Sequence, residues 1–246
     1  MGCPDPNVAK KGGGAGLILT PKLAQNIVKM TRKGIEDWAS GRPIEDVDLN
    51  PNIIEYIRNF QKKFQIKPEK REIPVSVKTR TGYEDIVTED WISSLLEVEP
   101  VNITLHGRTL RQLYSGEANW EEIGKAAKLA KKTQTTLLGN GDIKTLEDAY
   151  ERIKKYGTDG ALIGRGAWGN PWIFQNNTPE QATKFQIALE HAEKFAELLP
   201  RNHFLTIRKH LAWYTKGFDN ASEVRGKLVR ANSVEEIREI INTIDL

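Results

Sequence analysis

The segment Val101-Asn-Ile-Thr-Leu-His-Gly-Arg108 decides the fold, because a β-rich run ends there in a polar, glycine-containing stop. The same order recurs in three further runs, at residues 73–79, 135–139 and 160–164. Apolar residues at helical spacing follow the runs, as at Trp91, Leu95 and Val98. Strands that alternate with helices form right-handed βαβ units, so the sequence predicts an α/β fold with a parallel sheet covered by helices.

The composition excludes several classes of protein. Hydrophobic residues make up 39% and charged residues 28% of the 246 residues, which argues against a disordered or fibrous chain. No apolar run reaches the roughly 18–20 residues that a membrane helix needs, and the N-terminus has no secretory signal. The single cysteine, Cys3, cannot form an internal disulfide or, alone, a metal site. We therefore expect a cytoplasmic protein without a membrane or metal partner.

Two regions lack the alternation of strands and helices. Before residue 73 the sequence predicts a glycine-rich loop over 3–16, a helix over 21–38, and a second apolar stripe from Ile53 to Phe64. After Pro179 only helical spacing remains. We predict an α/β domain at 1–178, with an inserted helical segment around 40–72, and a helical domain at 179–246.

Polar residues occupy the end of each predicted strand, where parallel sheets gather their chemistry. They are Lys78 and Arg80, His106-Gly-Arg108, Asn140-Gly-Asp142, and Gly164-Arg165-Gly166. A single lysine or arginine there is usually solvated, but four such ends predict a common ligand or a shared salt-bridge network. Glycine lets backbone N–H groups approach a phosphate closely. Neither a Walker loop nor a dinucleotide fingerprint is present, so a single-phosphate cofactor, such as a flavin mononucleotide (FMN), fits better than a nucleoside triphosphate.

Cys3 has two interpretations. A free cysteine is most often a small buried hydrophobe. However, Pro4, Pro6, Lys10 and Lys11 favour an exposed loop of positive potential, where a thiol can donate or accept a proton.

The helical tail carries the strongest basic bias. Between residues 201 and 230, seven cations stand against two acids, whereas the whole chain has a net charge of only +3. Lys209, Trp213 and Lys216 follow the spacing of one helix face, which would suit a phosphate backbone with a stacked base. The alternative is a solvated basic face with Trp213 packed into a domain interface.

Five motifs resemble those of the tRNA-dihydrouridine synthases and occur in that family's order. They are Met1-Gly-Cys-Pro4, Val77-Lys-Thr-Arg80, Leu105-His-Gly-Arg-Thr109, Gly139-Asn-Gly-Asp-Ile143, and Ile163-Gly-Arg-Gly-Ala167 with Asn170-Pro-Trp-Ile-Phe174. Arg208-Lys-His-Leu-Ala-Trp-Tyr214 resembles the family's C-terminal helical domain. The resemblance therefore covers nearly the whole chain, and the motifs are specific together although each is weak alone.

The resemblance implies a TIM (β/α)₈-type barrel, here only its C-terminal half of about four parallel strands, followed by an all-helical domain. It implies an FMN-dependent enzyme that reduces uridine in tRNA to dihydrouridine, with NADPH as reductant. Cys3 would be the general acid that protonates carbon five of uracil while the flavin delivers hydride to carbon six. The implied cofactor-binding residues are Lys78 and His106 at the flavin ring and side chain, and Asn140, Gly141, Asp142, Gly164 and Arg165 at the phosphate. Further candidates for contact with tRNA or cofactor are Arg80, Arg108, Arg208, Lys209, Trp213 and Lys216.

The chain departs from the family at its start. In the family the Gly-Cys-Pro motif follows the fourth strand, whereas here it opens the chain, which predicts a fragment or a truncated gene model. A half barrel leaves strand edges and apolar helix faces uncovered. We therefore expect the chain alone to fold poorly, to self-associate, or to need a separate N-terminal piece. A stable monomer with a tightly bound yellow flavin would contradict this expectation.

Two other functions are alternatives to a tRNA-dihydrouridine synthase. One is another FMN-barrel oxidoreductase acting on a free pyrimidine or an enone, and the basic tail speaks against it. The other is a non-catalytic RNA-binding remnant whose flavin site has been lost. NADPH oxidation with unmodified tRNA by the wild type, but not by Cys3→Ala, would reject the remnant.

Overall fold

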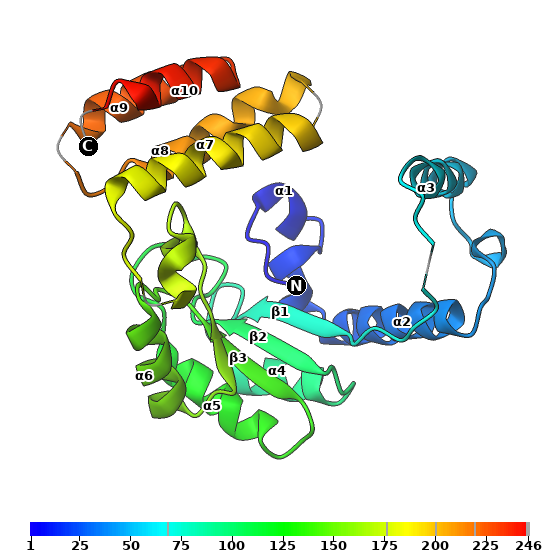
Figure 1. Cartoon of the computed structure of the whole chain (residues 1–246). Helices are drawn as coiled ribbons and strands as arrows, with labels where there is room; N and C mark the ends of the chain where they lie inside the picture. The colour runs from blue at the N-terminus through cyan, green and yellow to red at the C-terminus, as the bar shows by residue number, and fades with distance from the viewer. Residues whose placement is uncertain (68, 176, 200, 219, 245–246) are drawn as a thin grey trace. The chain divides into compact units, whose positions relative to one another are not determined.

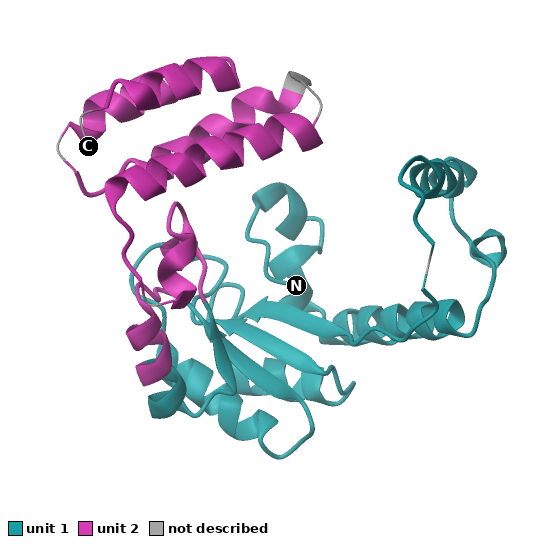
Figure 2. Cartoon of the chain, viewed as in Figure 1, with its two compact units in different colours: residues 1–141, 152–162 teal, residues 142–151, 163–246 magenta. Residues whose placement is uncertain are grey.

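The computed structural model describes residues 1–67, 69–175, 177–199, 201–218 and 220–244 (Figure 1). The chain divides into two compact units (Figure 2). Unit 1 comprises residues 1–141 and 152–162, and unit 2 comprises residues 142–151 and 163–246. Helix α6, Leu146–Tyr156, has residues in both units. The sequence predicts a single domain boundary at residue 178. This boundary differs from the division into the two compact units, and it stays a prediction.

Unit 1 is built on a parallel four-stranded sheet whose order follows the chain. The strands are β1 (Ser76–Arg80), β2 (Asn102–His106), β3 (Thr136–Asn140) and β4 (Gly160–Leu162). All four predicted β-rich runs are therefore strands, and the predicted α/β fold with a parallel sheet is confirmed. β1 begins three residues later than its predicted run, and Pro74 in that run has no N–H to donate to a neighbouring strand.

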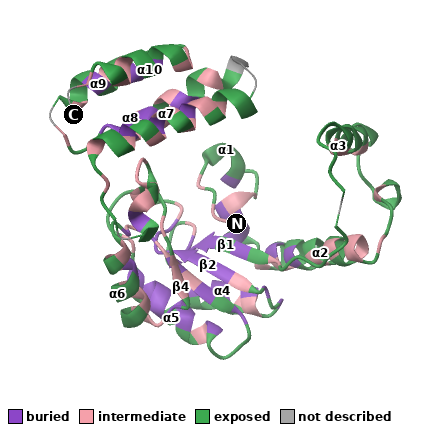
Figure 3. Cartoon of the chain, viewed as in Figure 1, coloured by how far each residue is buried: buried purple, intermediate pink, exposed green. Residues whose placement is uncertain are grey.

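Two helices, α4 (Thr88–Leu96) and α5 (Trp120–Ala130), pack with the sheet of unit 1. Every second strand residue faces them, because successive side chains on a strand point to opposite faces. On this face Ile103 and Leu105 of β2 are fully buried, as is Ile123 of α5. Figure 3 shows buried residues along the strands and on α5. The indole of Trp91 on α4 donates to Thr79 Oγ1 of β1 at 2.9 Å. The helix-facing side of the sheet is therefore the core of unit 1.

The N-terminal part of unit 1 is helical. It contains α1 (Pro6–Ala9), η1 (Gly14–Leu19), α2 (Pro21–Ala39), η2 (Ile44–Asp46) and α3 (Pro51–Lys63). α2 is fixed to α4 and its C-terminal turn, since Gln25 donates to the Ser94 carbonyl and Arg32 to the Val98 carbonyl, both at 2.7 Å. By contrast, α3 buries none of its residues, and Ile53, Phe60 and the following Phe64 of its predicted apolar stripe are exposed.

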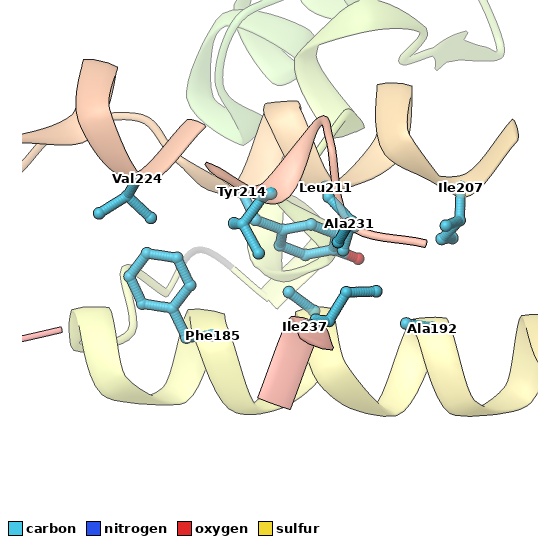
Figure 4. Packing of buried hydrophobic residues seen from close by; sticks show 10 residues of the cluster. Phe185, Ala192, Ile207, Leu211, Tyr214, Val224, Ala231 and Ile237 are labelled. Atoms are coloured by element: carbon cyan, nitrogen blue, oxygen red, sulfur yellow. The ribbon is translucent and has the colours of Figure 1, made fainter. Parts of the chain in front are cut away.

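The helices of unit 2 that follow residue 179 are α7 (Gln181–Leu198), η5 (Arg201–Ile207), α8 (Arg208–Tyr214), α9 (Ala221–Leu228) and α10 (Val234–Asn242). They enclose one apolar cluster, in which Phe185 and Ala192 of α7 project toward Leu211 and Tyr214 of α8 (Figure 4). The sequence predicts one helix through residues 204–214, whereas the structure has the 3₁₀ segment η5 up to Ile207 and the α-helix α8 only from Arg208. The helix predicted to include Ala231 ends earlier, at Leu228, although Ala231 is still buried in the cluster.

Two short 3₁₀ segments precede this cluster in unit 2. They are η3 (Arg165–Ala167) and η4 (Pro171–Gln175). Among the helices that the structure describes, none combines the length and apolar character that would let it cross a bilayer.

Candidate functional site

One row of polar side chains crosses the sheet of unit 1 near its carboxyl edge. Arg80, His106 and Asn140 are register partners on β1, β2 and β3. Lys78 lies two residues before Arg80 and so points to the same face. This is the face opposite to the one that α4 and α5 cover. The sheet thus presents two cations, an imidazole and an amide on one side, next to the edge where parallel strands gather functional groups.

Lys78 and Asn140 are in direct contact across this face. The Lys78 ammonium donates to Asn140 Oδ1 at 3.0 Å, and Asn140 Nδ2 donates to the Leu162 carbonyl on β4 at 2.8 Å. The amide of Asn140 therefore has a fixed orientation. Desolvation by the surrounding protein, and secondarily the positive charge of Arg80, lower the pKa of Lys78 below its ordinary value. Among the residues that the structure describes, neither Lys78 nor Arg80 forms an ion pair. A cationic face without carboxylate partners favours an anionic or electron-rich ligand.

Arg80 and Arg108 are almost completely buried, with 5% and 2% of their surfaces exposed. Arg80 donates to the carbonyls of Gly2 and Thr109, both at 3.0 Å. Arg108 donates to the Gly116 carbonyl at 2.7 Å. Burial lowers the pKa of Arg80. Arg80 thus ties two loops to β1, and Arg108 joins the two ends of the loop segment 108–116. A contact of either arginine with substrate or cofactor stays a prediction.

Cys3 is exposed, so the interpretation of this residue as a small buried hydrophobe is wrong. Its backbone is held from two sides. The Cys3 carbonyl accepts from the Ala15 N–H at 3.0 Å, and the neighbouring Gly2 carbonyl accepts from Arg80. Since Arg80 belongs to the polar row, these contacts hold the backbone of Gly2 and Cys3 beside that row, and Cys3 remains accessible to solvent.

The turn after β3 requires a glycine. Gly141 has φ 137°, and a Cβ there would lie 2.4 Å from the Ala118 Cβ. The buried indole of Trp120 donates to the Gly141 carbonyl at 3.0 Å. Asp142, the next residue, has φ 53°, which is uncommon for a residue with a side chain. Packing from α5 therefore fixes the backbone at the end of β3.

Asp142 and Arg165 form an ion pair within unit 2, with 3.0 Å between Oδ1 and Nη2. Gly164 precedes Arg165, and a Cβ on Gly164 would meet no atom within 4 Å. The backbone beside Arg165 is therefore open to a ligand. Because Asp142 is bound to the guanidinium, it orients Arg165 within unit 2.

Arg208 has a structural role in the helical part of unit 2. Its guanidinium donates to the Ala231 carbonyl at 2.9 Å, the Arg230 carbonyl at 2.8 Å and Asn232 Oδ1 at 2.9 Å. It therefore joins the start of α8 to the connection between α9 and α10. A direct contact of Arg208 with tRNA stays a prediction.

The prediction that Lys209, Trp213 and Lys216 share one helix face is wrong for Lys216. α8 ends at Tyr214, and Thr215 leaves the helical conformation with ψ 39°. Lys209 is exposed on the helix. Trp213 is half-buried and stacks on Trp168, with 4.4 Å between ring centroids and 13° between ring planes.

A pocket of unit 2 contains residues that sequence reasoning missed. Its volume is about 290 Å³, and its lining includes Lys144, Trp168 and Lys184 together with Arg165, Trp213 and Lys216. These residues come from segments far apart in the chain, so no local spacing could have brought them together. The only signal was the tryptophan within the Gly164-Arg-Gly-Ala-Trp-Gly169 motif.

The fold and the polar row define the class of the protein. A four-stranded parallel βα sheet, with polar groups at its carboxyl edge, followed by a helical cluster, is a partial (β/α) barrel with a C-terminal helical domain.

Comparison with known proteins identifies the family. Residues 52–245 match the family described as "Dihydrouridine synthase (Dus)". A "Probable tRNA-dihydrouridine synthase" of Staphylococcus epidermidis is 32% identical over 253 residues, covering 100% of this chain and 66% of the relative. A relative of the same description from Staphylococcus aureus is 31% identical with the same coverage. The chain belongs to the dihydrouridine synthase family, which is a family of TIM-barrel oxidoreductases.

A third relative, of lower identity, also matches nearly the whole chain. The "Probable tRNA-dihydrouridine synthase 1" of a Synechocystis species is 29% identical over 255 residues, covering 98% of this chain and 61% of the relative. The chain thus spans 61–66% of the length of these relatives.

Proposed function

We propose that this chain takes part in the reduction of uridine to dihydrouridine in tRNA, with FMN as cofactor and NADPH as reductant. The observation that carries the proposal is the polar row of the sheet. In this row the Lys78 ammonium contacts Asn140 at 3.0 Å, and Lys78 forms no ion pair among the described residues. The relatives' description as tRNA-dihydrouridine synthases supports the same reaction. Its setting would be the reducing cytoplasm.

The donors that are present fit FMN. In unit 1, Lys78, His106 and Asn140 offer a cation and hydrogen-bonding groups to a flavin ring with several carbonyl and nitrogen acceptors. In unit 2, Arg165 and the open backbone at Gly164 offer the cation and the space that a phosphate needs. When bound, FMN would supply the hydride chemistry of the reaction.

The chain's own residues then orient the reactants and move one proton. Within unit 1, Lys78 and Asn140 would hold the flavin ring. Within unit 2, the Arg165 guanidinium, oriented by Asp142, would hold a phosphate. Cys3 would donate a proton to carbon five of the uracil, for which an exposed thiol on a fixed backbone is suited. The target base has to leave its stack to reach such a site.

The test is formation of dihydrouridine by the 246-residue chain. Unmodified tRNA, FMN and NADPH are incubated with the wild type and with Cys3→Ala, and the digested tRNA is examined by mass spectrometry for the gain of two hydrogen atoms. Product from the wild type and at least a hundredfold less from the variant would support the proposal. Absence of product from the wild type under conditions in which it binds FMN and tRNA would refute it.

The basic pocket of unit 2 favours a second candidate, an RNA-binding protein without turnover. In that case the same experiment would show tRNA binding but neither NADPH oxidation nor dihydrouridine. Another FMN-barrel oxidoreductase would oxidise NADPH with a free pyrimidine or an enone and would bind tRNA no better than other anions.

The need for self-association or for a separate N-terminal piece also remains a proposal. The exposed apolar stripe of α3 supports it, since Tyr56 and Phe60 are 68% and 44% exposed on a helix that buries nothing.

A further inference from the structure

The pocket of unit 2 carries more positive charge than Arg165, the one lining residue whose cation the flavin proposal uses. Four cations line it, from four separate segments: Lys144 before α6, Arg165 in η3, Lys184 on α7 and Lys216 after α8. No aspartate or glutamate is among its lining residues. Within the part of the chain that the structure describes, no ion pair engages Lys144, Lys184 or Lys216. Arg165 pairs with Asp142, but the three lysines have no counter-charge in the lining. Like charges repel one another, so the arrangement favours an anionic ligand.

An aromatic platform adjoins these cations. Trp168 and Trp213 both line the pocket, and their rings stack at 4.4 Å. Trp213 is half-buried, whereas Trp168 is 44% exposed, so Trp168 is the outer ring of the pair. An exposed indole beside a cationic pocket can stack on a nucleobase whose phosphate occupies the pocket.

The backbone holds the platform rigidly. Gly169 has φ 68°, and a Cβ there would lie 2.3 Å from the Trp213 carbonyl oxygen. The loop that carries Trp168 therefore packs directly on the C-terminal end of α8, at a distance that only glycine allows. Asn170 and Thr178 add neutral hydrogen-bonding groups to the lining. The pocket is therefore built from elements with fixed positions within unit 2.

We propose that this pocket binds a backbone phosphate of an RNA strand, with Lys144, Lys184 and Lys216 as the cations that contact it and Trp168 as the surface on which a neighbouring base stacks. The inference rests on the proposed function, because it assigns to the tRNA substrate a contact with three lysines that the flavin proposal does not use. A carboxylate ligand would use the cations but not the indole. RNA accounts for both features, since each nucleotide carries a phosphate and a base.

The test compares tRNA binding by variants of the full chain at several salt concentrations. Lys184→Gln and Lys216→Gln each remove one cation of the pocket, and Lys194→Gln removes one from the same helix α7 outside it, where Lys194 pairs with Glu197. We expect each pocket variant to weaken tRNA binding about five- to tenfold and to reduce the slope of log K against log salt by about 1. Lys194→Gln should bind within about twofold of the wild type.

The platform is tested separately. Trp168→Ala should weaken tRNA binding about tenfold, and Trp168→Phe should restore most of the loss, because a phenyl ring can still stack. FMN affinity should be unchanged in Lys184→Gln and Lys216→Gln, and far-ultraviolet circular dichroism shows whether each variant is folded.

Three outcomes would overturn the inference. The first is wild-type affinity and salt slope in both pocket variants. The second is a loss of FMN binding with tRNA binding retained, which would assign the pocket to the cofactor. The third is no tRNA binding by the wild type. Failure of the proposed function is recognised differently: the wild type would then bind FMN and tRNA without forming dihydrouridine.

Discussion

Replacing Trp120 by phenylalanine tests how α5 fixes the turn at the end of β3. The indole is 4% exposed, and its Nε1 donates to the Gly141 carbonyl at 3.0 Å. Its ring also fills the space in front of Gly139, where a Cβ would lie 2.4 Å from the indole. Phenylalanine keeps an aromatic ring but removes both the donor and part of this volume.

The magnitude follows from these two losses. Leaving a buried carbonyl without a partner costs about 1–3 kcal/mol. Removing roughly two buried methylene equivalents costs about 1–2 kcal/mol more. We therefore expect Trp120→Phe to lower the free energy of unfolding by about 2–5 kcal/mol. FMN affinity should also fall, because Gly141 leads directly into Asp142.

Trp38→Phe is the matched control. The Trp38 indole also donates to a backbone carbonyl, that of Glu69 at 3.1 Å, but the bond is exposed. Water can replace the lost donor there, so we expect a change within about 0.5 kcal/mol. Urea titrations followed by circular dichroism measure both variants against the wild type. Equal, small losses in the two variants would refute the reasoning that the buried bond fixes the turn.

Three further predictions concern other parts of the chain. Burial lowers the pKa of His191 in unit 2 below its ordinary value of 6.5, so the unfolded chain binds protons more readily. Stability that is present above pH 6.5 should fall as the pH drops toward 5, and His191→Gln should flatten this dependence in thermal melts. Gly141→Ala should destabilise the chain by about 1–3 kcal/mol and weaken FMN binding, because alanine is strained at φ 137° and its Cβ meets Ala118; a wild-type urea midpoint would contradict this. If the stripe of α3 mediates self-association, Phe60→Ser should shift the chain toward monomer in sedimentation experiments without changing its helix content, and an unchanged sedimentation profile would exclude this stripe as the interface.

The fold was predictable from the sequence where a local period sets the structure. Alternation in the run through residues 101–106 defines both a strand and its two faces, so the sheet and the row containing His106 and Asn140 follow from spacing alone. The same reasoning fails at helix ends. Lys216 continues the spacing of α8, but Thr215 is already outside the helix. The periodic spacing of residue types does not show where a helix ends.

The candidate site was less predictable because its contacts join distant segments. Arg208 looks like a basic surface residue in sequence, yet three acceptors on the α9–α10 connection engage it. Trp168 belongs to the motif that follows β4, but Lys184 lies far beyond it on α7, and the two residues share no motif. Such groups meet only through tertiary packing, which a single sequence does not specify by spacing.

Titration of the chain with FMN tests the central claim most directly, namely that the polar face of the sheet holds a flavin. Quenching of flavin fluorescence measures binding to the wild type and to Lys78→Met, which keeps the aliphatic stem but removes the ammonium that contacts Asn140. The account predicts saturable binding by the wild type and at least about tenfold weaker binding by the variant. Equal affinities for the two proteins, or no binding by a folded wild type, would contradict it.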